Sequence, residues 1–444
     1  MLKRKITDKL IEWKAEPNKC CLLVKGARQV GKTFIINEFA KANYRNYIYI
    51  NFEINKEYMR IFDGDLDFKT LKMKLETAFP NVKLEAHQTI IFLDEIQSCP
   101  NARVALKSFA LDGSFDVVAS GSLLGINYKQ ISSYPVGYEK VIELAPLDFE
   151  EFLWGVGFSA DNIAFTRNCF LQKQPLDEFV LNRFAEQFKL YTLVGGMPRV
   201  VEEFIQTSSL TSVLEFQRSI LQEYFSDIAK YTPIAEKPKV ADCLLSIPIQ
   251  LGKKNKKFTY ADIAQQNKTV HSSSAVGAKK YLGSINWLKE AGIVHYCYNL
   301  TEPALPLTSN IKLDAFKIYM RDSGLLIAAL EAGTQKAILD NELYINKGGI
   351  VENVCAAELA KAFESLMYFE KKSKLEVDFI LNLDGQATAI EVKSGDNKQS
   401  KSLKSILQNY HTVTRYIKLE KNTNLYVDRY GIEHYPLFMV MFIA

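Results

Sequence analysis

Apolar residues in the first 120 positions fall into short, nearly continuous runs that are separated by segments with helical spacing. The runs cover residues 21–24, 47–52, 89–94 and 115–120. Continuous apolar runs are typical of strands that are buried on both faces, as in a parallel sheet covered by helices. The pattern therefore predicts an α/β domain with a parallel sheet, over residues 1–155.

The middle of the chain has a different pattern. Residues 212–230 carry apolar side chains at helical spacing, and two shorter helical segments follow at 258–264 and 274–288. A helix, a turn, a second helix and then two short strands is the order of a winged helix. We predict a winged-helix domain over 233–335, joined to the first domain by a helical lid or connector over 156–232.

The last hundred residues return to alternating helix and strand signals. An amphipathic helix is expected at 349–359, and strands are expected at 366–369, 375–381 and 387–394. We expect this third domain, also α/β, to occupy residues 336–444.

The loop after the first apolar run carries the clearest chemical signal. Residues 26–33 read Gly-Ala-Arg-Gln-Val-Gly-Lys-Thr, the G-x-x-x-x-G-K-T pattern of a phosphate loop (Walker A) between a strand and a helix. Glycines let backbone N–H groups close around phosphate oxygens, Lys32 adds a positive charge on the outer phosphates, and Thr33 would ligate Mg²⁺. The predicted ATP-binding residues are Gly26, Ala27, Arg28, Gln29, Val30, Gly31, Lys32 and Thr33.

Two acidic residues end the third apolar run. Asp94 and Glu95 (Walker B) follow 89–94 directly, and ligands bind at this carboxyl edge of open α/β sheets. Asp94 is expected to hold Mg²⁺, and Glu95 is expected to act as the catalytic residue that polarises the attacking water. Ser120 and Ser122 end the next strand and are candidates for contact with the γ-phosphate, although serine is also common in turns.

These motifs occur together with others in a specific order. The further motifs are Phe-Leu-Asp-Glu-Ile-Gln at 92–97, Ser-Gly-Ser-Leu-Leu-Gly at 120–125, Pro-Leu-Asp-Phe-Glu-Glu-Phe at 146–152 and Gly-Gly-Met-Pro at 195–198. The combination resembles a group of prokaryotic AAA-type ATPases that carry a C-terminal domain of formerly unknown function. The resemblance runs to about residue 425 and implies an AAA-type P-loop fold that uses ATP and Mg²⁺.

One position departs from that group. Many of its members place an arginine or lysine after the Pro-Val-Gly of 135–137, where this chain has Tyr138. No arginine finger is therefore assigned. Lys140, Arg28 and Arg199 are alternative sources of the positive charge.

Three acids and a lysine are candidates for chemistry in the C-terminal region. Glu352 lies on the expected helix, Asp378 on the second strand, and Glu391 and Lys393 on one face of the third. This arrangement resembles the core of the PD-(D/E)XK nuclease superfamily, which has the restriction-endonuclease-like fold. The resemblance implies that Glu352, Asp378 and Glu391 bind Mg²⁺ or Mn²⁺, and that Lys393 is a catalytic residue that orients or activates water.

The C-terminal motif also has plainer interpretations. Tyr368 and Lys398 are candidates for substrate contact, but acids and a lysine on a strand also form ordinary ion pairs. A domain of this kind can retain its residues and bind without cutting.

The composition of the chain excludes few classes of protein. The net charge of +4 over 444 residues is too small to indicate nucleic-acid binding, so local clusters carry that argument. Lysines at 253–257, with Lys279 and Lys280, are expected either to contact phosphates or to be solvated on a domain that packs against the ATPase. Seven cysteines and five histidines show no metal-ligand spacing. No apolar run approaches the length of a membrane span and no signal peptide is evident, so we expect a cytoplasmic protein without a membrane partner.

The sequence thus predicts an ATP-hydrolysing AAA-type protein that acts on nucleic acid, DNA rather than RNA, through a nuclease-like domain. A first alternative is a non-cutting molecular switch whose nucleotide state controls homo-oligomerisation or partner binding. A second alternative is a DNA-bound regulator in which the winged helix dominates.

Overall fold

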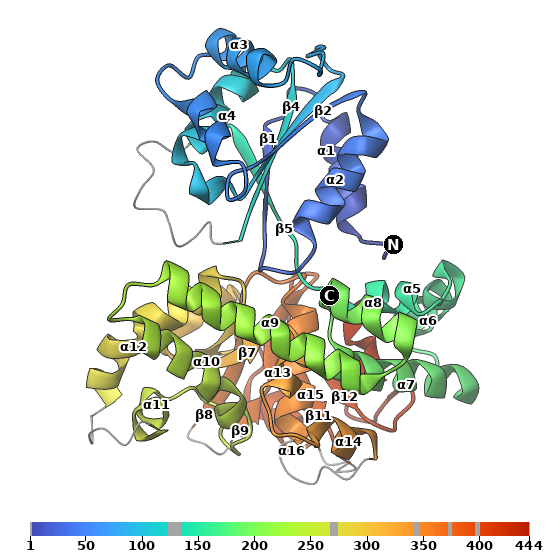
Figure 1. Cartoon of the computed structure of the whole chain (residues 1–444). Coiled ribbons are helices and arrows are strands. Elements are labelled where there is room, and N and C mark those ends of the chain that lie inside the picture. Colours follow the sequence, from blue (N-terminus) through green and yellow to red (C-terminus); the bar gives the residue numbers. More distant parts are fainter. Residues whose placement is uncertain are drawn as a thin grey trace. The chain divides into compact units, whose positions relative to one another are not determined.

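The chain forms two compact units. The computed structural model describes residues 2–122, 135–266, 274–340, 347–371, 375–395 and 400–443, without the side chains of 264–279 and 347. The N-terminal unit comprises Lys3–Ala145 with Glu290–Gly292, and the C-terminal unit comprises Pro146–Lys289 with the residues from Ile293 onward. Figure 1 colours the N-terminal unit from blue to cyan.

The N-terminal unit contains a parallel five-stranded sheet in the order β2-β3-β4-β1-β5. Its elements are α1 (Ile6–Ala15), β1 (Cys21–Lys25), α2 (Lys32–Asn43), β2 (Asn46–Asn51), η1 (Lys56–Phe62), α3 (Phe68–Ala78), β3 (Thr89–Asp94), η2 (Ile96–Ser98), α4 (Pro100–Asp112), β4 (Asp116–Gly121) and β5 (Glu139–Glu143). Helices cover both faces of the sheet, with α1 and α2 on one side and α3 and α4 on the other (Figure 1).

Covering both faces explains the apolar runs of the sequence. Every residue of β3 is buried, because side chains that point to either face of a doubly covered sheet meet a helix. Leu75 of α3 and Phe109 of α4 share one core with Ile50 and Ile91 of the sheet. The predicted α/β fold with a parallel sheet is confirmed, and the predicted boundary at 155/156 stays a prediction.

The C-terminal unit combines many helices with two sheets. Its helices are α5 (Phe149–Gly155), α6 (Ala160–Gln172), α7 (Glu178–Val194), α8 (Pro198–Thr207), α9 (Leu210–Tyr231), α10 (Lys237–Leu251), α11 (Tyr260–Gln266), α12 (Ser274–Glu290), η4 (Leu307–Asn310), α13 (Ser323–Ala328), α14 (Thr334–Leu339), α15 (Lys347–Leu359), α16 (Lys401–Asn409) and η5 (Leu437–Phe442). Its strands are β6 (Val294–Leu300), β7 (Ile311–Met320), β8 (Leu366–Lys371), β9 (Leu375–Val377), β10 (Phe379–Leu383), β11 (Gln386–Lys393), β12 (Arg415–Glu420), β13 (Tyr426–Val427) and β14 (Glu433–Pro436).

The strands of this unit form sheets in the orders β7-β6-β8-β9 and β10-β11-β12-β14-β13. The helices and the β6–β7 hairpin expected for a winged helix occur in the predicted order, but β6 also pairs in parallel with β8. Strands before and after position 335 therefore share one sheet. The predicted boundaries at 232/233 and 335/336 stay predictions.

The second C-terminal strand differs from its prediction. The sequence predicts one strand over 375–381, whereas the structure has β9 and β10 with Asp378 between them. The Asp378 carboxylate accepts a hydrogen bond from the Val392 backbone N–H at 2.8 Å. The side chain of Asp378 thus reaches β11 at the point where the strand is interrupted.

Helices also pack against the strands of this unit. α15 packs against β11, and α16 packs against β9 and β11. Leu403 and Ile406 of α16 lie in one buried cluster with Ala389 of β11 and Ile380 of β10. None of the helices in the described ranges is long and apolar enough to span a bilayer.

Two of the sequence motifs meet inside the C-terminal unit. The Leu147 backbone N–H donates to the Gly196 carbonyl at 2.7 Å, and the Gly196 N–H donates to Asp322 Oδ2 at 2.6 Å. Asp322 is fully buried, and its Oδ1 accepts from the Leu325 N–H at the start of α13 at 2.9 Å. These bonds join the segment before α5, the segment before α8 and helix α13.

Candidate functional site

The phosphate-loop residues lie between β1 and α2, as the sequence predicts. Gly31 adopts a φ of +90°, a left-handed conformation that glycine reaches without steric cost, and Gln29 also has a positive φ. The Lys32 ammonium donates to the carbonyls of Gly26 at 3.0 Å and Ala27 at 2.8 Å. The side chain of Lys32 is therefore buried inside the loop that it would share with phosphate oxygens.

Asp94 lies at the centre of a hydrogen-bond network at the carboxyl edge of the sheet. Its Oδ2 accepts from Thr33 Oγ1 at 2.9 Å and from the Tyr49 hydroxyl at 3.0 Å. Asn51 donates to the same oxygen at 3.1 Å, and the Ser120 hydroxyl donates to Oδ1. The network joins β2, β3, β4 and α2, so the predicted residues Thr33, Asp94 and Ser120 are brought together.

Glu95 begins the turn after β3 with a φ of +53°, in the left-handed region that non-glycine residues rarely adopt. Its backbone N–H donates to Asp94 Oδ1 at 3.1 Å, and its carboxylate accepts from Gln97 Nε2 at 2.5 Å. Burial raises the pKa of Glu95, although Gln97 and Lys32 partly offset the effect. A raised pKa makes a carboxylate a better acceptor of a proton from water near neutral pH.

The remaining candidates of this unit have distinct environments. Ser122 is buried, and within the described residues its hydroxyl has no hydrogen-bond partner, which leaves it available for a phosphate oxygen or water. Arg28 lies 3.7 Å from Glu53, and Lys140 pairs with Glu16.

Tyr138, which follows the Pro-Val-Gly of 135–137, packs against a lysine. Arg199, the third alternative source of positive charge, packs against an aromatic ring. The Tyr138 ring receives the ammonium of Lys107 at 5.5 Å. Arg199, in the C-terminal unit, stacks on Phe216 at 4.9 Å. These contacts do not assign an arginine finger.

Tyr49 and Asn51 are site residues that motif reasoning missed. Asn51 is the register partner of Asp94, and its Oδ1 accepts from the backbone N–H groups of Glu53 and Ile54. The alternation of polar Tyr49 and Asn51 at the end of an otherwise apolar strand is the signal that would have found them.

The donor set at this edge fits Mg²⁺. Thr33 supplies a hydroxyl oxygen and Asp94 a carboxylate, which are the hard ligands that Mg²⁺ prefers beside phosphate oxygens. Both groups already converge within 2.9 Å. Thr33 and Asp94 would therefore hold the ion, directly or through its water shell.

In the C-terminal unit, the four predicted residues lie in one neighbourhood, with Lys317 between Glu352 and Asp378. Asp378 is held beside β11 by its bond to Val392, and Lys393 pairs with Glu391 at 2.7 Å. The carboxylate of Glu391 is buried, and its Oε2 is without a hydrogen-bond partner among the described residues. Burial lowers the pKa of Lys393, but Glu391 outweighs it and the pKa is raised overall.

Glu352 has other partners. Its Oε1 accepts from Lys317 Nζ at 2.8 Å and from the Tyr319 hydroxyl, and its Oε2 lies 2.6 Å from Lys256 Nζ. Burial would raise the pKa of Glu352, but Lys317 and Lys256 outweigh it and hold the pKa below its ordinary range. The pKa of Asp378 is raised, first by burial and then by the negative charge of Glu352.

These contacts do not suit Glu352 as a metal ligand, because lysines already occupy both of its oxygens. Over the described ranges, no group of three or more His, Cys, Asp or Glu side chains gathers closely enough to hold a metal ion. The role of Glu352, Asp378 and Glu391 as metal ligands therefore stays a prediction.

The other C-terminal candidates also differ from their expected roles. Tyr368 is fully buried and its ring lies over the Lys317 ammonium at 4.9 Å, so it is not placed to contact a substrate. In the lysine-rich loop, Lys253 pairs with Asp262 at 2.6 Å and Lys256 pairs with Glu352. Lys398 and the Lys279 side chain lie outside the described residues.

Lys280 is exposed, and its ammonium lies 5.0 Å from the centre of the Tyr281 ring. Of the two lysines that the sequence predicts on α12, Lys280 has a described side chain, and that side chain is exposed to solvent.

A row of charged side chains continues from Glu391 across the second sheet. Strand register pairs Glu391 with Lys418 and Lys418 with His434, so these side chains share a face. Lys418 and His434 lie 2.6 and 2.5 Å from Glu420, and Lys418 is fully buried. No local motif marks Lys418 or His434, because only the register of β11, β12 and β14 brings them beside Glu391.

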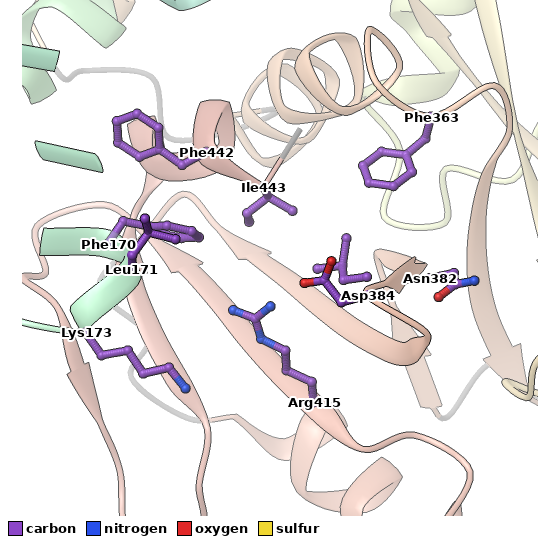
Figure 2. A pocket seen from close by; sticks show the side chains of 10 residues that line it. Phe170, Leu171, Lys173, Phe363, Asn382, Asp384, Arg415, Phe442 and Ile443 are labelled. Atoms are coloured by element: carbon purple, nitrogen blue, oxygen red, sulfur yellow. The ribbon is translucent and has the colours of Figure 1, made fainter. Parts of the chain in front are cut away.

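A cavity of about 370 Å³ lies elsewhere in this unit, beside α6, β12 and η5. Figure 2 shows aromatic side chains, among them Phe170 and Phe442, around it, with Arg415 and Lys173 at one side. Arg415 and Lys173 bond the same carboxylate, Glu433, at 2.9 and 2.8 Å. Both cations are thus already engaged by one buried carboxylate, and we assign the cavity no ligand.

Glu433 provides a test of how this unit responds to acid. Burial would raise its pKa, but hydrogen bonds from Arg415, Lys173 and Tyr435 outweigh it, so its folded-state pKa lies below the ordinary 4.5. The stabilisation is therefore complete above pH 4.5 and is lost as the pH falls below that value. Glu433→Gln is expected to lower the free energy of unfolding by about 2–3 kcal/mol at pH 7.

The measurement is thermal unfolding of the full chain at pH 7, 5, 4 and 3. The difference between Glu433→Gln and the native protein should stay constant from pH 7 to 5 and shrink toward pH 3, whereas Glu186→Gln, at an exposed helical position, should change little at any pH. A difference that stays constant over this range would contradict the pKa assignment.

Comparison with known proteins agrees with the N-terminal geometry. Residues 18–153 match the model of the AAA domain family. Residues 185–336 match a domain of unknown function (DUF8612), and residues 347–438 match another domain of unknown function (DUF4143). An uncharacterised protein of Methanocaldococcus jannaschii is 24% identical over 440 residues, which cover 97% of this chain and 86% of the relative.

Solved structures show more distant likeness. A Walker-type ATPase of Pyrococcus abyssi is 14% identical with a TM-score of 0.43, over 74% of this chain and 96% of that one. The Orc1 protein of Aeropyrum pernix, solved in complex with DNA, is 14% identical with a TM-score of 0.29, over 77% of this chain and 93% of that one. At these values the likeness carries no conclusion about what this chain binds.

The family match and the hydrogen-bond network at the end of β3 lead to the same assignment. The match begins before β1 and ends after β5, so it includes the phosphate loop, Asp94 and Glu95. Residues 18–153 are therefore similar to an AAA domain and carry its phosphate loop.

Proposed function

We propose that the N-terminal unit hydrolyses ATP at the edge of the sheet formed by the ends of β1, β3 and β4. The observation that carries this proposal is the Asp94 carboxylate, which joins Thr33 of the phosphate loop to Ser120 of β4 and lies next to Glu95. Lys32 neutralises charge on the β- and γ-phosphates, and Thr33 and Asp94 hold the Mg²⁺ site. Bound Mg²⁺ supplies charge neutralisation between the outer phosphates.

In this proposal Glu95 orients the attacking water and accepts its proton. The Gln97 amide holds the Glu95 carboxylate at 2.5 Å, and the left-handed turn at Glu95 directs the chain away from β3. Ser122 contacts the γ-phosphate or the water through its available hydroxyl.

Replacement of Lys32 tests this proposal. Lys32→Ala removes the charge that would bind the outer phosphates, so we expect ATP affinity to fall by about 10- to 100-fold, as expected for loss of a charge-assisted hydrogen bond of about 1.5–3 kcal/mol. Hydrolysis at ordinary ATP concentrations should be lost with it. The measurements are nucleotide binding by titration and phosphate release with Mg²⁺.

A matched control is Lys41→Ala at the end of the same helix, where the lysine is 64% exposed and pairs with Glu38. This variant should bind and hydrolyse ATP as the native protein does. Unchanged hydrolysis in Lys32→Ala would reject the assignment of the site.

For the C-terminal unit we propose a role in which the nucleotide state controls binding to a partner, with nucleic acid as the favoured partner and cutting not required. The engagement of both Glu352 oxygens by lysines supports binding over cutting. The predicted winged helix and homo-oligomerisation on ATP remain parts of this proposal.

Metal-dependent cleavage of DNA or RNA is the second candidate. It is favoured by the buried Glu391 Oε2 that lies without a hydrogen-bond partner, in the described part of the chain, beside Lys393 and Asp378. The two candidates separate in one assay of plasmid, single-stranded DNA and RNA with Mg²⁺ or Mn²⁺, with and without ATP. Cleavage that disappears in Lys393→Ala supports the nuclease, whereas ATP-dependent retention of nucleic acid without cleavage supports the switch.

A further inference from the structure

Lys317 occupies the interior of the C-terminal acidic centre. It lies on β7, and its side chain is only 1% exposed. Its ammonium lies 2.8 Å from Glu352 Oε1 and 2.7 Å from Glu376 Oε1, and Asp378 Oδ1 is 3.9 Å away. A single positive charge therefore faces three carboxyl groups, which come from α15, from β9 and from the break between β9 and β10.

The surroundings fit an ammonium group. Lysine has three N–H donors. Lys317 donates one hydrogen bond to Glu352 and forms an ion pair with Glu376, and the ring of Tyr368 covers the ammonium at 4.9 Å. Aromatic faces attract cations in this way. The Tyr319 hydroxyl, on the same strand as Lys317, donates to the Glu352 oxygen that Lys317 binds.

Lys256 adds a second positive charge on the other side of Glu352. Its ammonium lies 2.6 Å from Glu352 Oε2 and is 17% exposed. The two lysines thus bind the two oxygens of one carboxylate that is itself 3% exposed. A buried carboxylate needs such compensation, since burial of an isolated charge is very costly.

We propose that the Lys317 ammonium is the resident cation of this centre, holding Glu352, Glu376 and Asp378 together and keeping a divalent metal away from Glu352. In the predicted nuclease centre, a divalent cation would bind Glu352, Asp378 and Glu391 through oxygens at about 2.0–2.6 Å. Here the ammonium groups of Lys317 and Lys256 already compensate part of the negative charge from inside the protein. The inference goes beyond ATP hydrolysis and holds whether or not Asp378 and Glu391 bind a metal by themselves.

The test uses Mn²⁺ as a probe, because its paramagnetism reports bound and free ion directly. The full chain carries Asp94→Asn, which removes the carboxylate of the ATP site, and no nucleotide is present. Lys317→Met removes the charge but keeps an unbranched apolar chain, and we expect affinity for Mn²⁺ to rise by at least about tenfold, because a neighbouring positive charge at this distance strongly disfavours a metal ion. Adding Glu352→Gln to Lys317→Met should abolish that gain.

Lys317→Arg is the matched control, because it retains the charge and should gain no Mn²⁺ affinity. The proposal is overturned if Lys317→Met stays folded, by circular dichroism, and binds Mn²⁺ no better than its parent. It is also overturned if Glu352→Gln alone weakens Mn²⁺ binding, because Glu352 would then be a ligand in the native protein.

The Glu352→Gln variant decides the matter even where Lys317→Met fails to fold. It is isosteric, and its single amide oxygen can still accept hydrogen bonds from Tyr319 and Lys317, whereas its amide nitrogen cannot accept one from Lys256. Unchanged Mn²⁺ binding in Glu352→Gln supports the resident-cation assignment. Failure of ATP hydrolysis in the Lys32 test leaves this readout unaffected, so the two proposals fail separately.

Discussion

Glu95→Gln is expected to lower kcat for ATP hydrolysis by roughly 10²- to 10³-fold while leaving ATP affinity within about twofold of native. The substitution keeps the size of the side chain and its contact with Gln97, but an amide does not accept a proton from water. Because the pKa of Glu95 is raised by burial, the native carboxylate is suited to take that proton. The rate of phosphate release at saturating ATP measures the change in kcat. Equilibrium nucleotide binding on the same preparation measures the ATP affinity.

The control for this variant is Glu76→Gln on α3, at a side chain that is 50% exposed. It should hydrolyse ATP at the native rate. A Glu95→Gln variant that retains native kcat would place the catalytic group elsewhere. The next residues to examine would be Tyr49 and Asn51, whose side chains meet at Asp94.

The second large effect concerns stability. Gly196→Ala is expected to lower the free energy of unfolding of the C-terminal unit by about 3 kcal/mol or more. A Cβ atom at Gly196 would lie 2.1 Å from the Leu147 carbonyl oxygen, which is backbone and has no rotamer by which to move away. Relieving that clash breaks the Leu147–Gly196 bond and shifts the N–H that Asp322 accepts.

Gly283→Ala is the matched control, because a Cβ there meets no atom within 4 Å among the described residues, the backbone of its own helix apart. Gly283 lies inside α12, where alanine is the better helix former by about 0.5–1 kcal/mol, so this variant should be neutral or slightly stabilised. Chemical unfolding of both variants, monitored by circular dichroism, gives the free energies of unfolding to be compared. Equal stability of the two variants would contradict the role given to the contact between Leu147 and Gly196.

The N-terminal site could be predicted because its functional residues lie in short contiguous motifs. A phosphate loop needs a fixed local spacing between Gly26, Gly31 and Lys32, and Asp94 and Glu95 follow one recognisable strand. Strand order then determines which strand ends meet. Asn51 was missed because its contact with Asp94 depends on the pairing of β2 with β3 and not on any spacing along the chain.

The C-terminal centre was predicted only in part for the same reason. Glu391 and Lys393 are two positions apart, and their pairing follows from strand alternation. Lys317 lies on a strand that the sequence assigns to the preceding domain, and its partner Glu352 is on a helix 35 positions later. The spacing of acids indicated where ligands are available but did not show that lysines already bind one of them.

The lysine-rich loop is a further example. Its composition suggested a surface that contacts phosphates, yet Lys256 faces the interior and is 17% exposed. Side-chain direction in a loop follows from what the loop packs against, and no periodicity reports it.

The parallel pairing of β6 with β8 has a consequence for how this protein is built. Cys297 of β6 is the register partner of Leu366 of β8, so two strands separated by β7, α13, α14 and α15 must find each other late in the folding of the chain. Contacts of such long sequence separation slow folding and make it cooperative, because loop closure must precede any gain from pairing. The segments on either side of position 335 are therefore expected to lose their structure together when this unit unfolds.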